Sequence, residues 1–216
     1  MDVDTGRVEA FSDGVFAVAI TLLVLDLNVA GPPRATNGSL AAQLGHLWPN
    51  YAAYVVSFLV IGILWVNHHA LFAKIGRTDR PLLFLNLLLL MAVALLPFPT
   101  RTLAVYLRHG SSWDARVAAA LYSAVMWGVG LAFTGIYLWA GRGGLLHESV
   151  EVDEHRSAFR QFGLGSFAYP VIIGLAFVNA EVALLGHFVL AVFYVVDRTS
   201  VVAGAAPAGP DDPDPA

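Results

Sequence analysis

The sequence contains no cysteine and few charged residues. The absence of cysteine excludes disulfides, thiolate metal sites and a cysteine nucleophile. Charged residues make up only 13% of the chain, whereas a soluble domain carries roughly 25%. Hydrophobic residues make up 57% of the 216 residues. This composition argues against a soluble enzyme and predicts an all-α integral membrane protein.

Two further absences narrow the class of protein. The net charge of −4 is small and comes partly from the C-terminal tail, so the sequence indicates no nucleic-acid partner. The N-terminus lacks the basic start of a secretory signal, and the first hydrophobic segment is too long for a signal core. We therefore expect that segment to be retained as a membrane span.

Long hydrophobic runs divide the chain into six candidate membrane spans. A helix needs roughly 20 apolar residues to cross about 30 Å of hydrocarbon. The spans are predicted at about 8–29, 50–73, 81–107, 114–140, 157–179 and 182–200. Residues 1–202 are therefore expected to form one transmembrane domain. The remaining residues, 203–216, are Ala, Gly, Pro and Asp only, and we expect this tail to be disordered.

The distribution of basic residues predicts the orientation of the chain. Six spans place both termini on one side of the membrane. With the N-terminus inside, eight Lys and Arg residues fall on the inner side and four on the outer side. This bias favours cytoplasmic N- and C-termini. No clear internal repeat is found, so a symmetric pore built on one helix of this chain requires several subunits.

The first span carries polar residues where a lipid-facing helix favours leucine. They are Ser12, Asp13 and Thr21. A polar or charged group inside the bilayer costs several kcal/mol unless it faces a partner or water, so these positions are functional candidates. Ser12 and Thr21 also have a simpler explanation, because a helical hydroxyl often bonds to a carbonyl of the preceding turn.

Polar residues of three spans are predicted at one depth. Asp13, His69 and Asn86 each lie five or six residues inside the basic residue that marks the inner end of their span. At about 1.5 Å per residue, these three sit near one level. Trp65 and His68 share a helix face with His69, because their spacing is i, i+3 and i+4. We expect a hydrogen-bonding network here rather than a metal site, since adjacent histidines diverge and no third ligand is evident.

The first span also has two distinct faces. Val18 and Leu25 fall within about 20° of one line along the helix, and Asp13 lies about 140° away from Val18. Thr21 and Leu22 lie on either side of that line, and geometry alone does not choose between them. The Val18–Leu25 face fits ordinary packing between helices equally well. It also fits a hydrophobic ring around a symmetry axis, where such rings act as dewetting constrictions.

These polar residues and their spacing resemble those of a known family. The R-x-x-x-F-S-D pattern and the following G-V-F-A-V-A-I-T-L-L-V-L-D-L run resemble the first-helix signature of the endosomal/lysosomal potassium channel family, in its prokaryotic single-repeat branch. The residues that carry the resemblance are Arg7, Phe11, Ser12, Asp13, Trp65, His68, His69 and Asn86. It covers roughly the first half of the chain, and the second half matches only in the number of spans.

The resemblance implies a homotetramer of six-helix subunits whose first helices line a central pore. The family lacks the T-V-G-Y-G carbonyl filter, and the sequence contains no such run. Its constriction residues, carried onto this chain, are Val18, Thr21 and Leu25, so the resemblance selects Thr21 over Leu22. The first layer is more usually isoleucine or leucine in the family, so Val18 implies a slightly wider constriction. The signature residues would form a packing network within the subunit.

The sequence therefore predicts a passive potassium-selective or potassium-preferring channel in a prokaryotic cell membrane, with no cofactor and no enzymatic activity. Asp26 is either a helix-end charge in the headgroups or part of a cation-attracting ring at the pore mouth. The alternative is a proton-coupled or metal-ion transporter that uses Asp13, His68 and His69 as a relay. An intramembrane hydrolase built on Ser12 is weaker, because no credible oxyanion loop accompanies it.

Overall fold

The structure, a computed structural model, is mainly helical over the residues that it describes. These are residues 5–27, 39–109, 111–147 and 167–204, without the side chains of 26, 109 and 194–204. The helices are α1 (Thr5–Leu22), the 3-10 helix η1 (Leu23–Asp26), α2 (Leu40–His46), α3 (Trp48–Phe72), α4 (Arg80–Leu95), α5 (Pro97–His109), α6 (Ser112–Arg142), a helix over 167–178 and α8 (Ala180–Gly204). Within this part of the chain, β-structure is limited to one isolated bridge.

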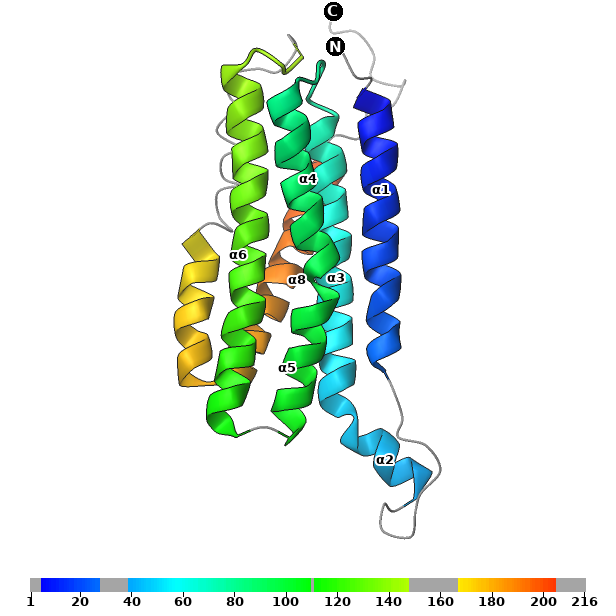
Figure 1. The fold of residues 1–216 in the computed structure, drawn as a ribbon, viewed down its shortest axis with the longest axis vertical. Helices are drawn as coiled ribbons and strands as arrows, with labels where there is room; N and C mark the ends of the chain where they lie inside the picture. Colours follow the sequence, from blue (N-terminus) through cyan, green and yellow to red (C-terminus); the bar gives the residue numbers. More distant parts are fainter. Residues whose placement is uncertain (1–4, 28–38, 110, 148–166, 205–216) are drawn as a thin grey trace, which may run out of the picture.

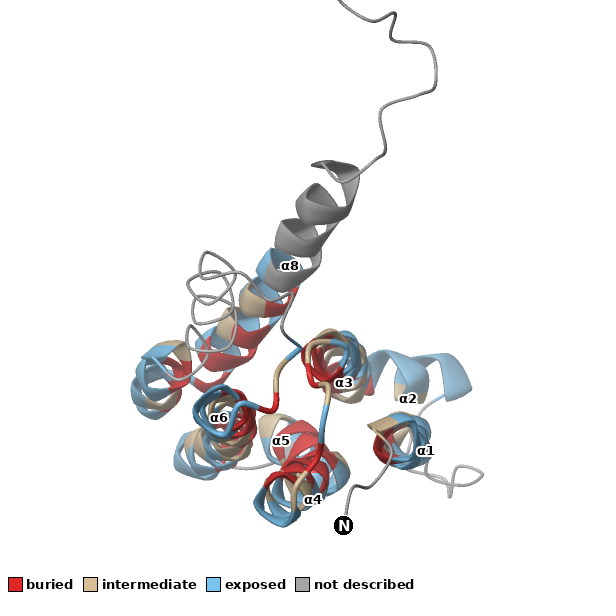
Figure 2. Ribbon diagram, turned by 90° about the horizontal axis from the view of Figure 1, so that it is seen from above, coloured by how far each residue is buried: buried red, intermediate tan, exposed pale blue. Residues whose placement is uncertain are grey.

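The long helices form a bundle with α1 at one side (Figure 1). Helices α3, α4, α5 and α6 pack together in the middle, α1 lies against α3 and α4, and α8 lies against α3 and α6. Figure 2 shows the buried residues on the sides of the helices that face one another. On α1 the buried side is narrow. Most of the surface of α1 therefore contacts no other described helix of the same subunit.

Four of these helices are long and apolar enough to cross a membrane. By length and composition they are Thr5–Leu25, Trp48–Phe72, Arg80–Arg108 and Ser112–Arg142. Two shorter apolar helices follow, Phe167–Val178 and Ala180–Phe193. The predicted fifth span begins in 148–166, which lies outside the described residues, as does most of the predicted tail. The number of six spans therefore stays a prediction.

Proline marks the starts of several helices. Pro49 and Pro81 lie in the first turns of α3 and α4, where the missing N–H would have had no helical partner. Pro97 begins α5, and the break between α4 and α5 falls at Leu96 directly before it. A proline is thus found at the start of three helices, and the one at Pro97 also marks a helix break.

The polar stretch between the first two spans contains a short helix that was not predicted. This helix, α2, begins after Ser39, whose hydroxyl accepts a hydrogen bond from the Ala42 amide at 3.3 Å. Serine is a preferred residue at this position because its oxygen satisfies an otherwise unpaired N–H. Periodicity did not reveal the helix, since α2 has only seven residues and none of them is buried.

Candidate functional site

A chain of buried hydrogen bonds fastens α1 to α3 and α4. The Ser12 hydroxyl donates to the Val8 carbonyl at 2.8 Å, and the Asn86 amide nitrogen donates to the Ser12 oxygen at 3.1 Å. Nε2 of His68 lies 3.0 Å from Oδ1 of Asn86. Because the amide nitrogen of Asn86 is the donor to Ser12, its oxygen is the acceptor, so His68 carries a proton on Nε2. Ser12, His68 and Asn86 are at most 2% exposed.

Aromatic rings enclose the histidine of this chain. The His68 ring stacks on Phe72 with centroids 4.4 Å apart and meets the edge of Phe16 at 5.4 Å. Phe16 comes from α1, so the histidine contacts α1 through a ring as well as through Asn86 and Ser12. These contacts make His68 part of the packing between the three helices, with its ring closed off from solvent.

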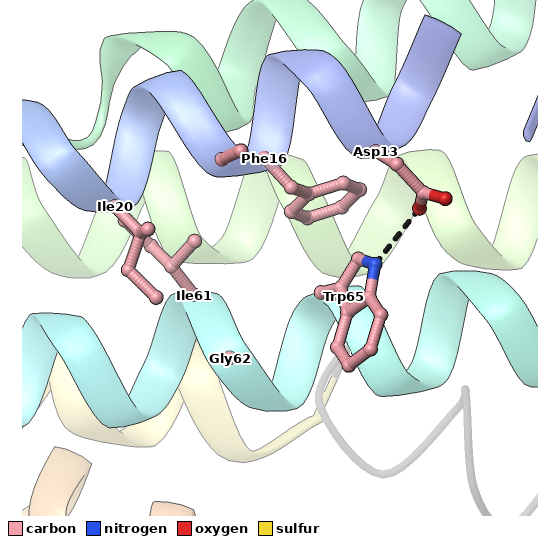
Figure 3. A pocket seen from close by; sticks show the side chains of 7 residues that line it. Asp13, Phe16, Ile20, Ile61, Gly62 and Trp65 are labelled. Carbon is pink, nitrogen blue, oxygen red and sulfur yellow. Dashed lines mark hydrogen bonds between the residues drawn. The ribbon is translucent and has the colours of Figure 1, made fainter. Parts of the chain in front are cut away.

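Asp13 pairs with the neighbouring helix at the edge of a groove. The Trp65 indole N–H donates to the Asp13 carboxylate at 2.8 Å, as the dashed line in Figure 3 shows. Both side chains are exposed within the subunit. The groove between α1 and α3 is lined by Asp13, Phe16, Ala17, Ile20, Ile61, Gly62 and Trp65. Asp13 therefore faces α3, as predicted from its angle to Val18, but it stays at the surface.

His69 takes a different partner from His68. Its Nδ1 lies 3.6 Å from a carboxylate oxygen of Glu9 on α1, and the His69 side chain is 66% exposed. Glu9 precedes Asp13 by four residues, and Trp65 precedes His69 by four. Since residues four apart share a helix face, two antiparallel helices place these residues in two adjacent pairs. Sequence reasoning missed Glu9, although this matched spacing could have identified it.

The other side of α1 is exposed along its length. We define the open face of α1 as Phe11, Gly14, Val18, Thr21 and Leu22 of α1 together with Leu25 of η1, which continues it; all six are exposed within the subunit. Val18 is 58% exposed and Leu25 is 68% exposed. The Thr21 hydroxyl lies 2.9 Å from the carbonyls of Ala17 and Val18. Thr21 and Leu22 are both exposed, so the subunit alone leaves the choice between them open.

Three further predicted site residues take no part in these polar contacts between helices. Arg7 is exposed, and the structure gives it no hydrogen bond or ion pair with another described residue. Phe11 is 57% exposed and lies on the open face. Asp26 ends η1, but its side chain lies outside the described residues. The packing network within one described subunit is thus made by Ser12, Asp13, Trp65, His68, His69 and Asn86.

The lengths of the helices and the contacts of α1 indicate the class of protein. Several apolar helices of membrane-spanning length surround a core, and one of them is held by buried polar groups while its opposite face stays open. Among the described residues, no group of three His, Cys, Asp or Glu side chains gathers to hold a metal ion. By length and composition, these helices are those of an integral membrane protein.

Comparison with known proteins assigns the family: the chain belongs to the endosomal/lysosomal potassium channel TMEM175 family. The sequence profile of that family matches residues 7–97. A potassium channel of Streptomyces collinus is 51% identical over 200 residues, which cover 92% of this chain and 95% of that protein. A potassium channel of Chamaesiphon minutus is 39% identical over 194 residues, with 89% and 94% covered.

A solved structure has the same fold. The crystal structure of a lysosomal potassium-selective channel TMEM175 homolog from Chamaesiphon minutus superimposes with a TM-score of 0.78 at 38% identity, covering 89% of this chain and 97% of that one. The predicted family is therefore confirmed, and with it the prediction that the chain is a channel-family membrane protein and not an enzyme.

Proposed function

We propose that this chain forms a passive, potassium-selective channel whose pore is lined by the open face of α1. The observation that carries the proposal is the division of α1 into two sides. One side is anchored by the Ser12–Asn86–His68 chain, and the other presents exposed apolar and small side chains with no partner in the described subunit. Relatives that share most of their length with this chain carry the name of potassium channel.

The proposed constriction consists of Val18, Thr21 and Leu25 from each subunit. A hydroxyl that donates its proton to the helix backbone, as Thr21 does, leaves its oxygen lone pairs free to accept from water or to face a cation. Rings of Val18 and Leu25 would flank that polar ring and oppose the entry of water. The sequence has no T-V-G-Y-G carbonyl filter, so selection of K⁺ is assigned to these side chains.

The proposed assembly is a homotetramer of six-helix subunits with cytoplasmic termini in a prokaryotic cell membrane. Grooves flank α1 on both sides, one toward α3 and one toward α4. The second groove is lined by Ala10, Phe11, Gly14, Val15, Val18, Ala19, Leu22 and Ala94. Apolar grooves beside an open helix face offer surfaces on which neighbouring subunits can pack. Asp26, at the end of η1, is assigned to the outer pore mouth.

The pairing of the polar residues argues against the transporter alternative. A proton relay requires Asp13, His68 and His69 to exchange protons with one another. In the described subunit they belong to three separate contacts, with Trp65, Asn86 and Glu9 respectively. Ser12 is fully buried and bound to the helix backbone, so a role as a hydrolytic nucleophile is not supported either.

Asp13→Asn separates the channel from the transporter. The amide oxygen can still accept from Trp65, so we expect only the loss of a charge-assisted bond, which is roughly twice as strong as a neutral one. K⁺ flux per assembled channel should be unchanged, although less protein should assemble. The measurement is efflux of K⁺ from liposomes that hold the purified protein, with and without a proton gradient.

The wild-type protein provides the reference in that experiment. Downhill K⁺ efflux without a proton gradient, in both the wild type and Asp13→Asn, supports the channel. Flux that requires a proton gradient and disappears in Asp13→Asn would make the protein a coupled transporter and would remove the pore from α1.

A further inference from the structure

The end of the bundle that holds the α1 N-terminus is closed by a clamp between two distant segments. The Gly76 and Arg77 amides donate to the Leu145 carbonyl at 2.9 and 3.2 Å, and the His147 amide donates to the Lys74 carbonyl at 3.0 Å. Backbone hydrogen bonds of this kind hold the α3–α4 connection against the end of α6. Figure 1 shows the α6 end and the α4 start side by side at this end of the bundle.

Side chains extend the clamp, and three arginines lie in or near the segments that it joins. The Trp139 indole N–H donates to both oxygens of Asp79 at 3.0 and 3.2 Å, and the Arg77 guanidinium donates to the Gly144 carbonyl at 3.1 Å. Arg80 directly follows Asp79. Arg142 follows Trp139 by three residues and so lies on the same face of α6, one turn nearer its end. We define the basic corner as Arg77, Arg80 and Arg142, all of which are exposed.

The charge of the basic corner is not neutralised by the acidic side chain beside it. Asp79 accepts from Trp139 and from the Leu82 amide at 2.9 Å, where it caps α4. Among the described residues, one carboxylate that already accepts two hydrogen bonds is thus set against three guanidinium groups. Each guanidinium has five N–H donors, and within the described part of the chain Arg77 uses one NH2 group, on the Gly144 carbonyl.

The position of the basic corner relative to the membrane surface indicates which anion it binds. Trp139 is 41% exposed, and a tryptophan that combines an apolar ring with a bonded N–H is typical of the membrane–water interface. Arg142 lies one helical turn after Trp139, and Arg80 directly follows Asp79, the hydrogen-bond partner of Trp139. The basic corner is therefore expected at the level of the lipid headgroups. Guanidinium groups bind phosphate through paired N–H donors. We propose that the basic corner binds the phosphate headgroup of an anionic phospholipid and so couples the α4 start and the α6 end to the membrane surface.

The chain itself contains a competing anion. Glu148, Glu151, Asp153 and Glu154 follow the clamp in the sequence and lie outside the described residues. Binding of these carboxylates would make the corner an internal contact instead of a lipid site. The lipid is favoured because an exposed tryptophan with a bonded N–H, such as Trp139, is typical of headgroup depth. The test includes a variant that removes the four carboxylates.

The test is binding of fluorescent phosphatidylglycerol to the full-length protein in phosphatidylcholine nanodiscs. The double substitution Arg80→Gln/Arg142→Gln is expected to weaken binding about 25-fold, since each arginine near an anionic surface contributes about fivefold in affinity. The matched control is Arg108→Gln/Arg116→Gln, which removes the same charge from α5 and α6 at the opposite end of the bundle. The control should bind like the wild type.

Four outcomes decide the proposal. Selective loss of binding in the corner variant supports it, and equal loss in both variants would show that only net charge matters. Inorganic phosphate at the same concentration should not displace the lipid; displacement would make the corner a site for a soluble anion. The last outcome concerns the variant in which Glu148, Glu151, Asp153 and Glu154 are all replaced by Gln or Asn. If this variant prefers phosphatidylglycerol and the wild type does not, the chain's own carboxylates occupy the corner, which would overturn the proposal. This experiment measures lipid binding and not K⁺ conduction. A negative result would therefore overturn the lipid site without contradicting the proposed channel.

Discussion

Replacing Asn86 with alanine is expected to lower the free energy of unfolding by about 2 to 3 kcal/mol, because a buried donor left without a partner carries its full desolvation cost. Asn86 is the link that accepts from His68 and donates to Ser12. Its removal leaves the Nε2–H of His68 unpaired between aromatic rings and opens a cavity between α1, α3 and α4. For a chain of this size the thermal midpoint should fall by about 5 to 10 °C.

Two further variants make the Asn86 prediction specific. Leu88→Ala, at a position on the same helix that is 52% exposed, should change the midpoint little. Ser12→Ala should cost less than Asn86→Ala, and the double substitution should cost less than the sum, because both remove the same hydrogen bond. The midpoints are measured on purified protein in detergent. Additive effects, or a midpoint unchanged in Asn86→Ala, would show that the Ser12–Asn86–His68 hydrogen bonds do not hold α1 in place.

Leu25→Ala is expected to raise K⁺ flux through reconstituted channels by about tenfold or more, since lowering a barrier by about 1.4 kcal/mol raises a rate tenfold. Leu25 is 68% exposed in the subunit, and in the proposed pore each subunit contributes one copy to an apolar ring. Shortening every copy widens the ring and eases the entry of water. Val18→Ala should act in the same direction, with a larger effect on the ratio of K⁺ to Na⁺ flux.

The matched control for Leu25 is Met91 on α4. Its side chain is 64% exposed in the subunit, so Met91→Ala removes a similar amount of exposed apolar surface from a different helix. Flux should stay at the wild-type value in this variant when measured in the same liposomes at equal protein density. Equal increases in Leu25→Ala and Met91→Ala would indicate general loosening of the bundle and would assign Leu25 to packing.

The sequence predicted that polar residues of three helices lie near one level, but not which partners they contact. Counting residues from the inner boundary placed Asp13, His69 and Asn86 at one level, and all three do contact neighbouring helices there. Rise per residue gives no information on which of two adjacent histidines turns inward. Packing decides this: His68 fits between the rings of Phe16 and Phe72, whereas His69 stays at the surface.

Contacts between segments far apart in the sequence could not be predicted either, because they too depend on how the helices pack. The clamp joins Gly76 and Leu145 through backbone groups, and backbone pairing leaves no pattern in side-chain types. The choice between Thr21 and Leu22 depends on an axis that one subunit does not contain, so it came only from the family resemblance. Both residues are exposed in the structure, and their roles stay a prediction.

Thiol modification of single cysteines on α1 tests the central claim most directly. The chain has no cysteine of its own, so Val18→Cys, Leu25→Cys and Met91→Cys each carry one reactive group without further engineering. K⁺ flux in liposomes is measured before and after a membrane-impermeant methanethiosulfonate reagent. The account predicts that the reagent blocks Val18→Cys and Leu25→Cys and leaves Met91→Cys conducting. Flux that persists through modified Val18→Cys and Leu25→Cys would contradict a pore lined by the open face of α1.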